Sequence, residues 1–291
     1  MQPTLCGRPV ATDRALVMAI VNRTPDSFYD QGANFTDAAA QARIRQVVDE
    51  GADIIDIGGV KAGPGDHVDA ATEAQRVVPM IRWIREQYPD LLISVDTWRS
   101  VVADEACAAG ADLINDTWAG ADPDLVGVAA ARRAGIVCSH TGGAGVRTRP
   151  HRMGYGDTVD GVVADVLAVV TAAAEKAAAA GVARDSIVID PTHDFGKNTH
   201  HGLALLRQVK VLVKTGWPVL MALSNKDFVG ETLGVDLNQR VEGTLAATAL
   251  SAEAGARIFR VHEVAGTRRV VDMVAAIAGS RPPARTVRGL A

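Results

Sequence analysis

The chain has 291 residues, of which 48% are hydrophobic, and a formal net charge of −4. This apolar content excludes a disordered protein, and the weak negative charge gives no general basis for binding nucleic acid or a membrane surface. No stretch of 18 apolar residues occurs, so a membrane span is not expected. Three widely spaced cysteines, Cys6, Cys107 and Cys138, predict reduced thiols in a cytoplasmic protein.

One pattern recurs eight times: a short apolar run, a polar residue, a loop and an amphipathic helix. The expected strands are 16–21, 54–57, 91–95, 113–114, 136–138, 186–189, 218–223 and 257–261. The expected helices are 36–50, 70–87, 99–109, 123–133, 159–180, 202–214, 237–254 and 267–278. Eight such units predict an α/β fold, a single-domain (β/α)8 TIM barrel over residues 1–279 with a flexible tail over 280–291. A doubly wound open sheet is the alternative, but no G-x-G-x-x-G follows the first strand.

Local signals support individual elements. Thr36 is a candidate N-cap for the first helix, which Gly51 closes. Thr24-Pro25-Asp26 predicts a turn after the first strand. The helix over 159–180 is expected to bury the valines spaced along one face, namely Val159, Val162, Val163, Val166 and Val170.

Polar residues stand where these strands end, and the carboxyl ends of barrel strands line the active-site face. The ring expected there consists of Asn22, Asp56, Asp96, Asn115, His140, Asp190, Lys226 and His262. Carboxylates, amides and a lysine facing one pocket suit a planar nitrogen heterocycle with an amino-pyrimidine edge. Asn22, Arg260 and His262 instead suit a phosphorylated leaving group with a hard divalent cation.

Several segments carry a resemblance to a known family. They are MAIVNRTPDSFYD at 18–30, GADIIDIGG at 51–59, ISVDT at 93–97, GADLIND at 110–116, Asp190-Pro191, 195–197, SNKDFVG at 224–230 and RVHEV at 260–264. In this order they resemble the dihydropteroate synthases, which join a dihydropterin pyrophosphate to p-aminobenzoate. The resemblance spans the whole barrel and implies the TIM-barrel fold.

The resemblance also implies roles for individual residues. It implies pterin contacts from Asp96, Asn115, Asp190 and Lys226, and pyrophosphate contacts from Asn22, Arg260 and His262. Asn22 would hold Mg2+, and Lys226, Arg260 and His262 would be the catalytic residues. It implies a homodimer and a small pterin-like ligand as partners.

The chain departs from the family at positions that bind the second substrate and the leaving group. The family's G-G-E-S-T-R-P-G loop reads G-G-V-K-A-G-P-G at 58–65, so its arginine is Gly63 and its threonine is Ala62. The arginine of S-R-K is Asn225. The glycine-rich D-P-G-x-G-F reads D-P-T-H-D-F at 190–195, and M-H-M reads S-H-T at 139–141. An arginine–phosphate contact is worth roughly 1.5–3 kcal/mol, and one charge-stabilising donor about 100- to 1000-fold in rate.

We therefore expect a homologue that is inactive or very weak as a synthase and still binds pterin-like or sulfone-like ligands. The alternative is an active synthase in which Lys61 replaces the lost arginine. Two further alternatives are an enzyme with another substrate that shares the pyrophosphate end, and a corrinoid-partnered methyl-transfer barrel. His140 and His193 also fit ordinary packing, and the basic run over 147–152 fits a solvated loop, a phosphate contact or a partner contact.

Overall fold

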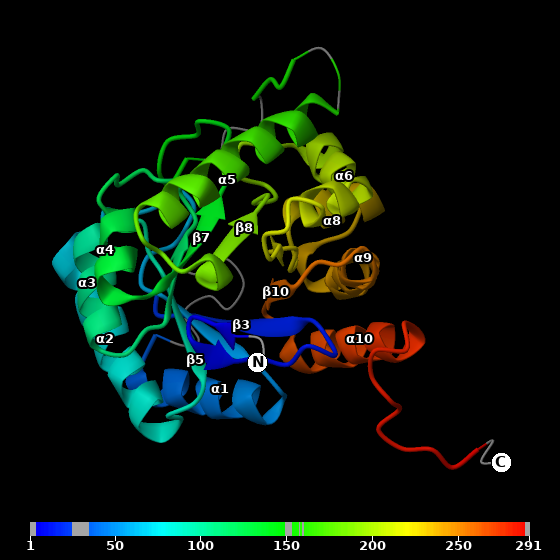
Figure 1. The fold of residues 1–291 in the computed structure, drawn as a ribbon, viewed down its shortest axis with the longest axis horizontal. Helices are drawn as coiled ribbons and strands as arrows, with labels where there is room; N and C mark the ends of the chain where they lie inside the picture. Colours follow the sequence, from blue (N-terminus) through cyan, green and yellow to red (C-terminus); the bar gives the residue numbers. More distant parts are fainter. Residues whose placement is uncertain (1–3, 25–34, 149–152, 157, 159, 289–291) are drawn as a thin grey trace.

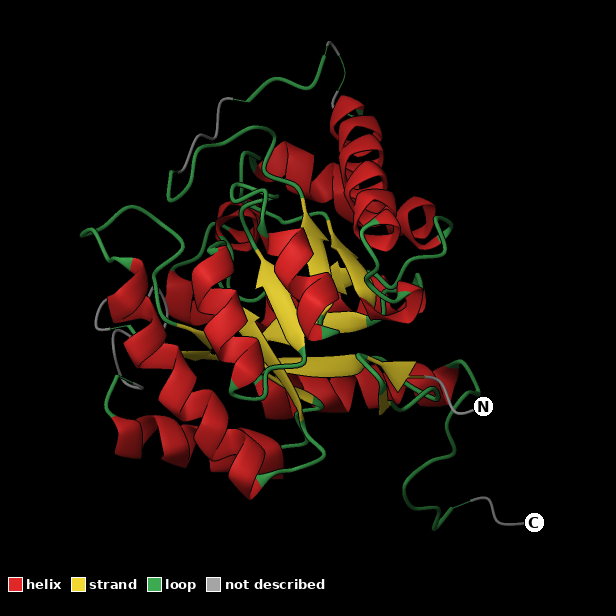
Figure 2. Cartoon of the chain, turned by 60° about the vertical axis from the view of Figure 1, so that its left-hand side comes forward, coloured by secondary structure: helices red, strands yellow, loops and turns green. Residues whose placement is uncertain are grey.

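The computed structural model describes residues 4–24, 35–148, 153–156, 158 and 160–288. Eight parallel strands form one sheet in the order β8-β7-β6-β5-β4-β3-β10-β9 (Figure 1). A parallel bridge between Ile189 and Val219 joins the two edges and closes the sheet. The helices lie outside this sheet (Figure 2). The TIM-barrel prediction is confirmed.

The barrel strands fall where apolar runs predicted them. They are β3 (Leu16–Asn22), β4 (Ile54–Gly58), β5 (Leu92–Asp96), β6 (Leu113–Asp116), β7 (Gly135–Ser139), β8 (Ile187–Asp190), β9 (Leu220–Met221) and β10 (Ile258–Val261). The helices are α1 (Asp37–Asp49), α2 (Ala70–Gln87), α3 (Ser100–Ala108), α4 (Leu125–Arg132), α5 (Gly161–Ala179), α6 (Thr199–Arg207), α7 (Val209–Val213), α8 (Asp227–Leu233), α9 (Val241–Glu253) and α10 (Val264–Ile277).

Some boundaries differ from the predicted ones. The helix predicted over 202–214 is two helices, α6 and α7, because the backbone at Gln208 leaves the helical region with φ −111°. The helix predicted over 237–254 begins with a short 3-10 turn, Leu237–Gln239, before α9. α8 was not predicted, although it has an aspartate in its first turn and ends at Gly234 in the left-handed conformation.

The predicted N-cap of α1 and the predicted buried face of α5 are confirmed for the residues that the structure describes. Thr36 caps α1 by accepting a hydrogen bond from the Ala39 amide. Val162, Val163, Val166 and Val170 are buried on α5. The predicted turn at Pro25-Asp26, and Val159, lie outside the described residues.

A short antiparallel hairpin, β1 (Thr4–Leu5) and β2 (Arg8–Pro9), precedes the barrel. Its Leu5 packs with inward-facing residues at the amino ends of the strands, including Leu16, Ile54 and Leu113. The barrel interior is therefore apolar at this end. Towards the carboxyl ends it becomes polar, with Asp56, Ser94 and Asn115 buried inside. This change along the strands confines polar chemistry to one end of the barrel.

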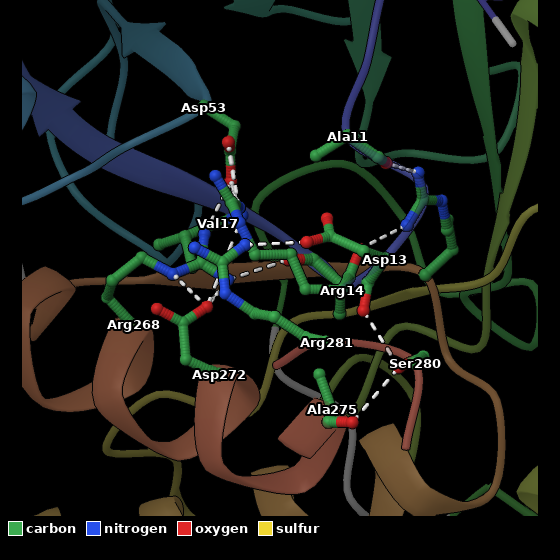
Figure 3. Close-up of polar contacts among 12 residues, drawn as sticks. Ala11, Asp13, Arg14, Val17, Asp53, Arg268, Asp272, Ala275, Ser280 and Arg281 are labelled. Carbon is green, nitrogen blue, oxygen red and sulfur yellow. Dashed lines mark hydrogen bonds and ion pairs between the residues drawn. The ribbon is translucent and has the colours of Figure 1, made fainter. Parts of the chain in front are cut away.

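An ion network ties the chain together at the amino ends of the strands (Figure 3). Asp53 accepts hydrogen bonds from Arg14 at 3.0 Å and from Arg268 of α10 at 2.8 Å. Asp13 accepts from Arg281 at 2.7 Å, and the Asp13 carbonyl accepts from Ser280. The first residues of the predicted tail are thus attached to the barrel.

Candidate functional site

The site lies at the carboxyl ends of the strands, where a parallel barrel brings all the strand ends together. Asn22, Asp96 and Asp190 are the last residues of β3, β5 and β8. Asn115 is in β6, and Arg260 is in β10. Two more residues follow strand ends: His262 lies directly after β10, and Lys226 is the N-cap of α8. The structure therefore brings these seven residues to one end of the barrel.

Arg260 is the centre of a charged network inside the barrel. Its Nε donates to Asp56 at 2.7 Å, and its Nη2 donates to Asp96 at 2.6 Å. Asp56 is fully buried and also accepts from Ser94 Oγ at 2.6 Å and Asn115 Nδ2 at 3.4 Å. The sequence predicted that Arg260 contacts pyrophosphate. In the structure, two nitrogens of its guanidinium bind the carboxylates of Asp56 and Asp96 instead.

Burial sets the protonation of Asp96. It raises the pKa of this carboxyl to about 6, against the lowering effect of the neighbouring Arg260 charge. Thr117 Oγ1 donates to the other carboxylate oxygen at 2.9 Å. A carboxyl that titrates near neutrality can accept a ring N–H when ionised and donate a hydrogen bond when protonated.

Lys226 and Asp190 form the other polar side of the site. The Lys226 ammonium donates to the His193 carbonyl and lies 4.9 Å from the centroid of the Phe195 ring. Trp118 meets the same ring edge-on, at 5.1 Å between centroids. Burial lowers the pKa of Lys226 and raises that of Asp190, although each charge opposes the shift of the other. A cation, a carboxyl and an aromatic wall match a flat polar heterocycle.

The residues expected to bind the leaving group, Asn22, Arg260 and His262, offer little positive charge that is not already paired. His262 Nδ1 lies 3.0 Å from Ser224 Oγ, and burial beside Arg260 lowers the pKa of His262 to about 3. The imidazole is therefore neutral near pH 7 and offers one N–H rather than a positive charge. A Cβ added at Gly58 would lie 3.2 Å from Asn22 Oδ1 and 3.8 Å from Asp96 Oδ2, so these two oxygens face the same space.

One predicted member of the ring is elsewhere. His140 is fully buried, and its Nε2 lies 2.7 Å from Asp165 on α5. It points out of the barrel towards the helix layer, so its expected place in the polar ring is wrong. His193 is also fully buried and packs against the ring of Phe228. Both histidines are packing residues.

The two positions where the family has an arginine, 63 and 225, carry no cation in this chain. Asn225 is fully buried, and its Oδ1 accepts from Thr244 of α9 at 3.5 Å. Gly63 is buried and has no side chain. Thr192 and Asp194 replace glycines and keep a positive φ, +52° and +68°. Thr192 is turned into the protein, donating to the Asp190 carbonyl at 2.9 Å.

Several contributing residues were not in the predicted site. Ser94, Thr117 and Trp118 support the carboxylates and the aromatic wall. Lys197 is buried and donates to three loop carbonyls, those of His140, Thr192 and Phe195. Ser94 could have been found, because it shares a strand and a two-residue alternation with Asp96.

Comparisons with known proteins identify the family of this chain. The family model described as pterin binding enzyme matches residues 18–262. The chain belongs to that family. A Mycobacterium leprae protein named inactive dihydropteroate synthase 2 is 70% identical over 291 residues, covering 100% of both chains.

Two solved dihydropteroate synthases share the fold. The Yersinia pestis enzyme with a sulfonamide drug complex is 33% identical, with TM-score 0.88 over 97% of this chain and 100% of that one. The Coxiella burnetii enzyme in complex with pteroic acid is 31% identical, with TM-score 0.82 over 92% of this chain and 94% of that one. The prediction of a dihydropteroate synthase homologue is confirmed. The full-length match to a relative named inactive favours the inactive paralogue over the active alternative with Lys61.

Proposed function

We propose that this chain binds a pterin-like ligand at the polar end of its barrel and does not carry out the synthase reaction. The heterocycle face is intact, since Asp96, Asn115, Asp190 and Lys226 lie together there. The observation that carries the proposal is the burial of Asn225 against α9, together with a glycine at position 63. The arginines that would meet p-aminobenzoate and pyrophosphate in the family are thus lost.

Catalysis requires groups that stabilise the charge developing on the leaving pyrophosphate. Here His262 is neutral, and two nitrogens of Arg260 are bonded to Asp56 and Asp96. Removing one such donor costs roughly 100- to 1000-fold in rate, so losing several leaves turnover far below that of an ordinary synthase.

In this proposal, Mg2+ binds only together with a phosphorylated ligand. Among the described residues, no group of three or more His, Cys, Asp or Glu side chains could hold a metal ion. Asn22 Oδ1 and Asp96 Oδ2 face one space, and Mg2+ takes oxygen ligands with the remainder supplied by water and phosphate. Asn22 would hold the ion, which would neutralise ligand phosphate oxygens.

We also propose a homodimer formed through α9 and α10. α9 buries the hydroxyl residues Thr244, Thr248 and Ser251, whereas Leu250 on it is 72% exposed. On the neighbouring α10, Met273 and Ile277 are exposed as well. A helix that buries its hydroxyl residues and exposes a leucine is suited to a self-complementary contact. Light scattering should show a dimer that Leu250→Asp converts to a monomer; a monomeric parent would overturn this part.

A cytoplasmic location is proposed on the three free cysteines, Cys6, Cys107 and Cys138, which suit a reducing compartment. Separately, no helix in the described part of the chain is long and apolar enough to cross a bilayer.

Calorimetric titration tests the binding proposal. Pteroic acid and 6-hydroxymethyl-7,8-dihydropterin pyrophosphate, the latter with and without Mg2+, should both bind the parent. Asp190→Asn and Lys226→Met should each weaken binding at least tenfold. Lys210→Met, which removes an exposed lysine paired with Glu253, is the matched control and should bind like the parent. A turnover rate near that of ordinary synthases, or no pterin binding by the parent, would overturn the proposal.

A further inference from the structure

The basic run in the long loop after β7 includes an arginine with an unexpected position. Arg147 donates from Nε to the carbonyls of Lys61 and Gly63, at 3.1 and 3.2 Å, and from Nη1 to the carbonyl of Asp66 at 2.6 Å. One guanidinium therefore holds three carbonyls of the loop after β4. We call this contact the mouth strap.

The mouth strap joins two loops at the end of the barrel that carries the site. In the sheet, β4 and β7 are separated by β5 and β6. The two loops joined by Arg147 begin at the carboxyl ends of β4 and β7, the end where Asp96 and Asn115 lie at the tops of β5 and β6. The two loops are therefore in contact at that end of the barrel although two strands separate β4 from β7.

The loop that carries Arg147 is anchored at both of its ends. Near its start, the His140 carbonyl accepts from the buried Lys197 ammonium at 2.8 Å. Near its end, Tyr155 Oη donates to the Gly196 carbonyl at 2.6 Å. Beside Arg147, Thr148 bonds back to the Gly145 carbonyl through both its amide and its hydroxyl. The arginine is thus part of a hydrogen-bonded turn over residues 145–148.

The loop on the other side is held by further arginines. Arg76 of α2 donates to the Gly59 carbonyl at 2.8 Å, and Arg99 donates to the Val68 carbonyl at 2.7 Å. These two contacts fix the ends of the loop, whereas Arg147 holds its middle. The planar guanidinium offers five N–H donors in a fixed geometry, which suits several carbonyl acceptors held side by side.

We infer that Arg147 is a positioning residue that straps the loop after β4 across the mouth of the barrel and thereby controls the exchange of ligand. The strap must loosen before a ligand can enter or leave between Asp96, Asn115 and the loops above them. Because its acceptors are backbone carbonyls of the protein, we expect it to change the rates of ligand exchange more than the affinity. The control of ligand exchange rests on the proposed function, which identifies the ligand. The contact between Arg147 and the loop after β4 does not depend on it.

Two measurements on the full chain test it. Hydrogen exchange without ligand should show amides of residues 60–66 exchanging about tenfold faster in Arg147→Ala, the change expected for losing one charge-assisted hydrogen bond. Stopped-flow binding of pteroic acid should show association and dissociation both faster by about tenfold, with little change in Kd. Arg147→Lys should lie between Arg147→Ala and the parent.

Arg132→Ala is the matched control, because Arg132 forms a bidentate pair with Asp104 on the exposed outer surface. It should change neither measurement. Parent-like exchange at 60–66 in Arg147→Ala overturns the strap. Faster exchange at 60–66 with unchanged binding rates in a parent that binds pteroic acid overturns its control of ligand exchange. If the parent binds no pterin, the proposed function fails, and hydrogen exchange still decides whether the strap exists.

Discussion

Replacing Arg260 by methionine should destabilise the fold strongly, because the arginine satisfies a carboxylate that water cannot reach. Asp56 is fully buried, the Arg260 side chain is 17% exposed, and the two form a 2.7 Å ion pair. Removing one partner of a buried pair costs about 3–5 kcal/mol. Unfolding entropy of about 2.1 cal/mol/K per residue gives ~0.6 kcal/mol/K for a chain of this length, so Tm should fall by about 5–8 °C.

The loss should also depend on pH. Asp96 has a raised pKa of about 6, which Arg260 keeps from rising further. Without Arg260, Asp96 will take up a proton more readily in the folded state. Since the unfolded carboxyl ionises near pH 4, this protonation stabilises the folded variant at low pH and is lost as the pH rises. The free energy of unfolding of Arg260→Met should therefore lie further below that of the parent at pH 8 than at pH 5.

Urea denaturation at both pH values measures the effect, and Arg132→Met provides the matched comparison. Arg132 makes two 2.7 Å bonds to Asp104, but the side chains are 40% and 45% exposed. An exposed pair of this kind is worth about 1 kcal/mol or less. If Arg260→Met costs no more than Arg132→Met at pH 8, the reasoning from burial is refuted.

Three further predictions concern residues around the site. Burial raises the pKa of Asp116 to about 6, so its protonation stabilises the fold below pH 4 and that contribution is lost as pH rises through 6; the stability of the parent relative to Asp116→Asn should fall by up to about 3 kcal/mol from pH 4 to pH 7 in urea titrations. Thr192→Gly should be about 1 kcal/mol more stable than Thr192→Ala by thermal denaturation, since φ is +52° there; equal or reversed stabilities would contradict backbone strain. Lys197→Met should lose about 3 kcal/mol or more, because three carbonyls lose their donor, whereas the exposed Lys210→Met should lose less than about 1 kcal/mol.

Strand alternation could have predicted most of the inward-facing set. Side chains two residues apart share a face of a strand, so residues in phase with the apolar interior also face inward. Leu113 and Val188 belong to the interior cluster, which places Asn115 and Asp190 inside. The same rule corrects His140: Val137 is interior, so Ser139 is in phase with it and His140 is not.

Other features could not be read from the sequence because they depend on contacts between distant segments. Strand alternation places Arg260 inside the barrel, because it is in phase with Ile258. Alternation does not predict which acceptor the guanidinium reaches. Asp56 and Asp96 became its partners because β10, β3, β4 and β5 are neighbours around the barrel. Likewise, Arg147 and Gly63 are 84 residues apart in the sequence, and no local sequence pattern predicts their contact.

Three residues in the loops after β8 and β9 adopt a backbone conformation that favours glycine. Thr192, Asp194 and Asn225 all adopt left-handed φ, which costs a non-glycine residue roughly 1–2 kcal/mol. Each is held by contacts that offset this cost: Thr192 bonds to the Asp190 carbonyl, Asp194 accepts from the Asp227 amide at 2.6 Å, and the Asn225 amide donates to Thr244. Tertiary bonds therefore hold this loop path without glycine. The path keeps Asp190 and Lys226 at the same end of the barrel, so we attribute the proposed loss of synthase chemistry to the missing arginines at positions 63 and 225 and not to a different fold.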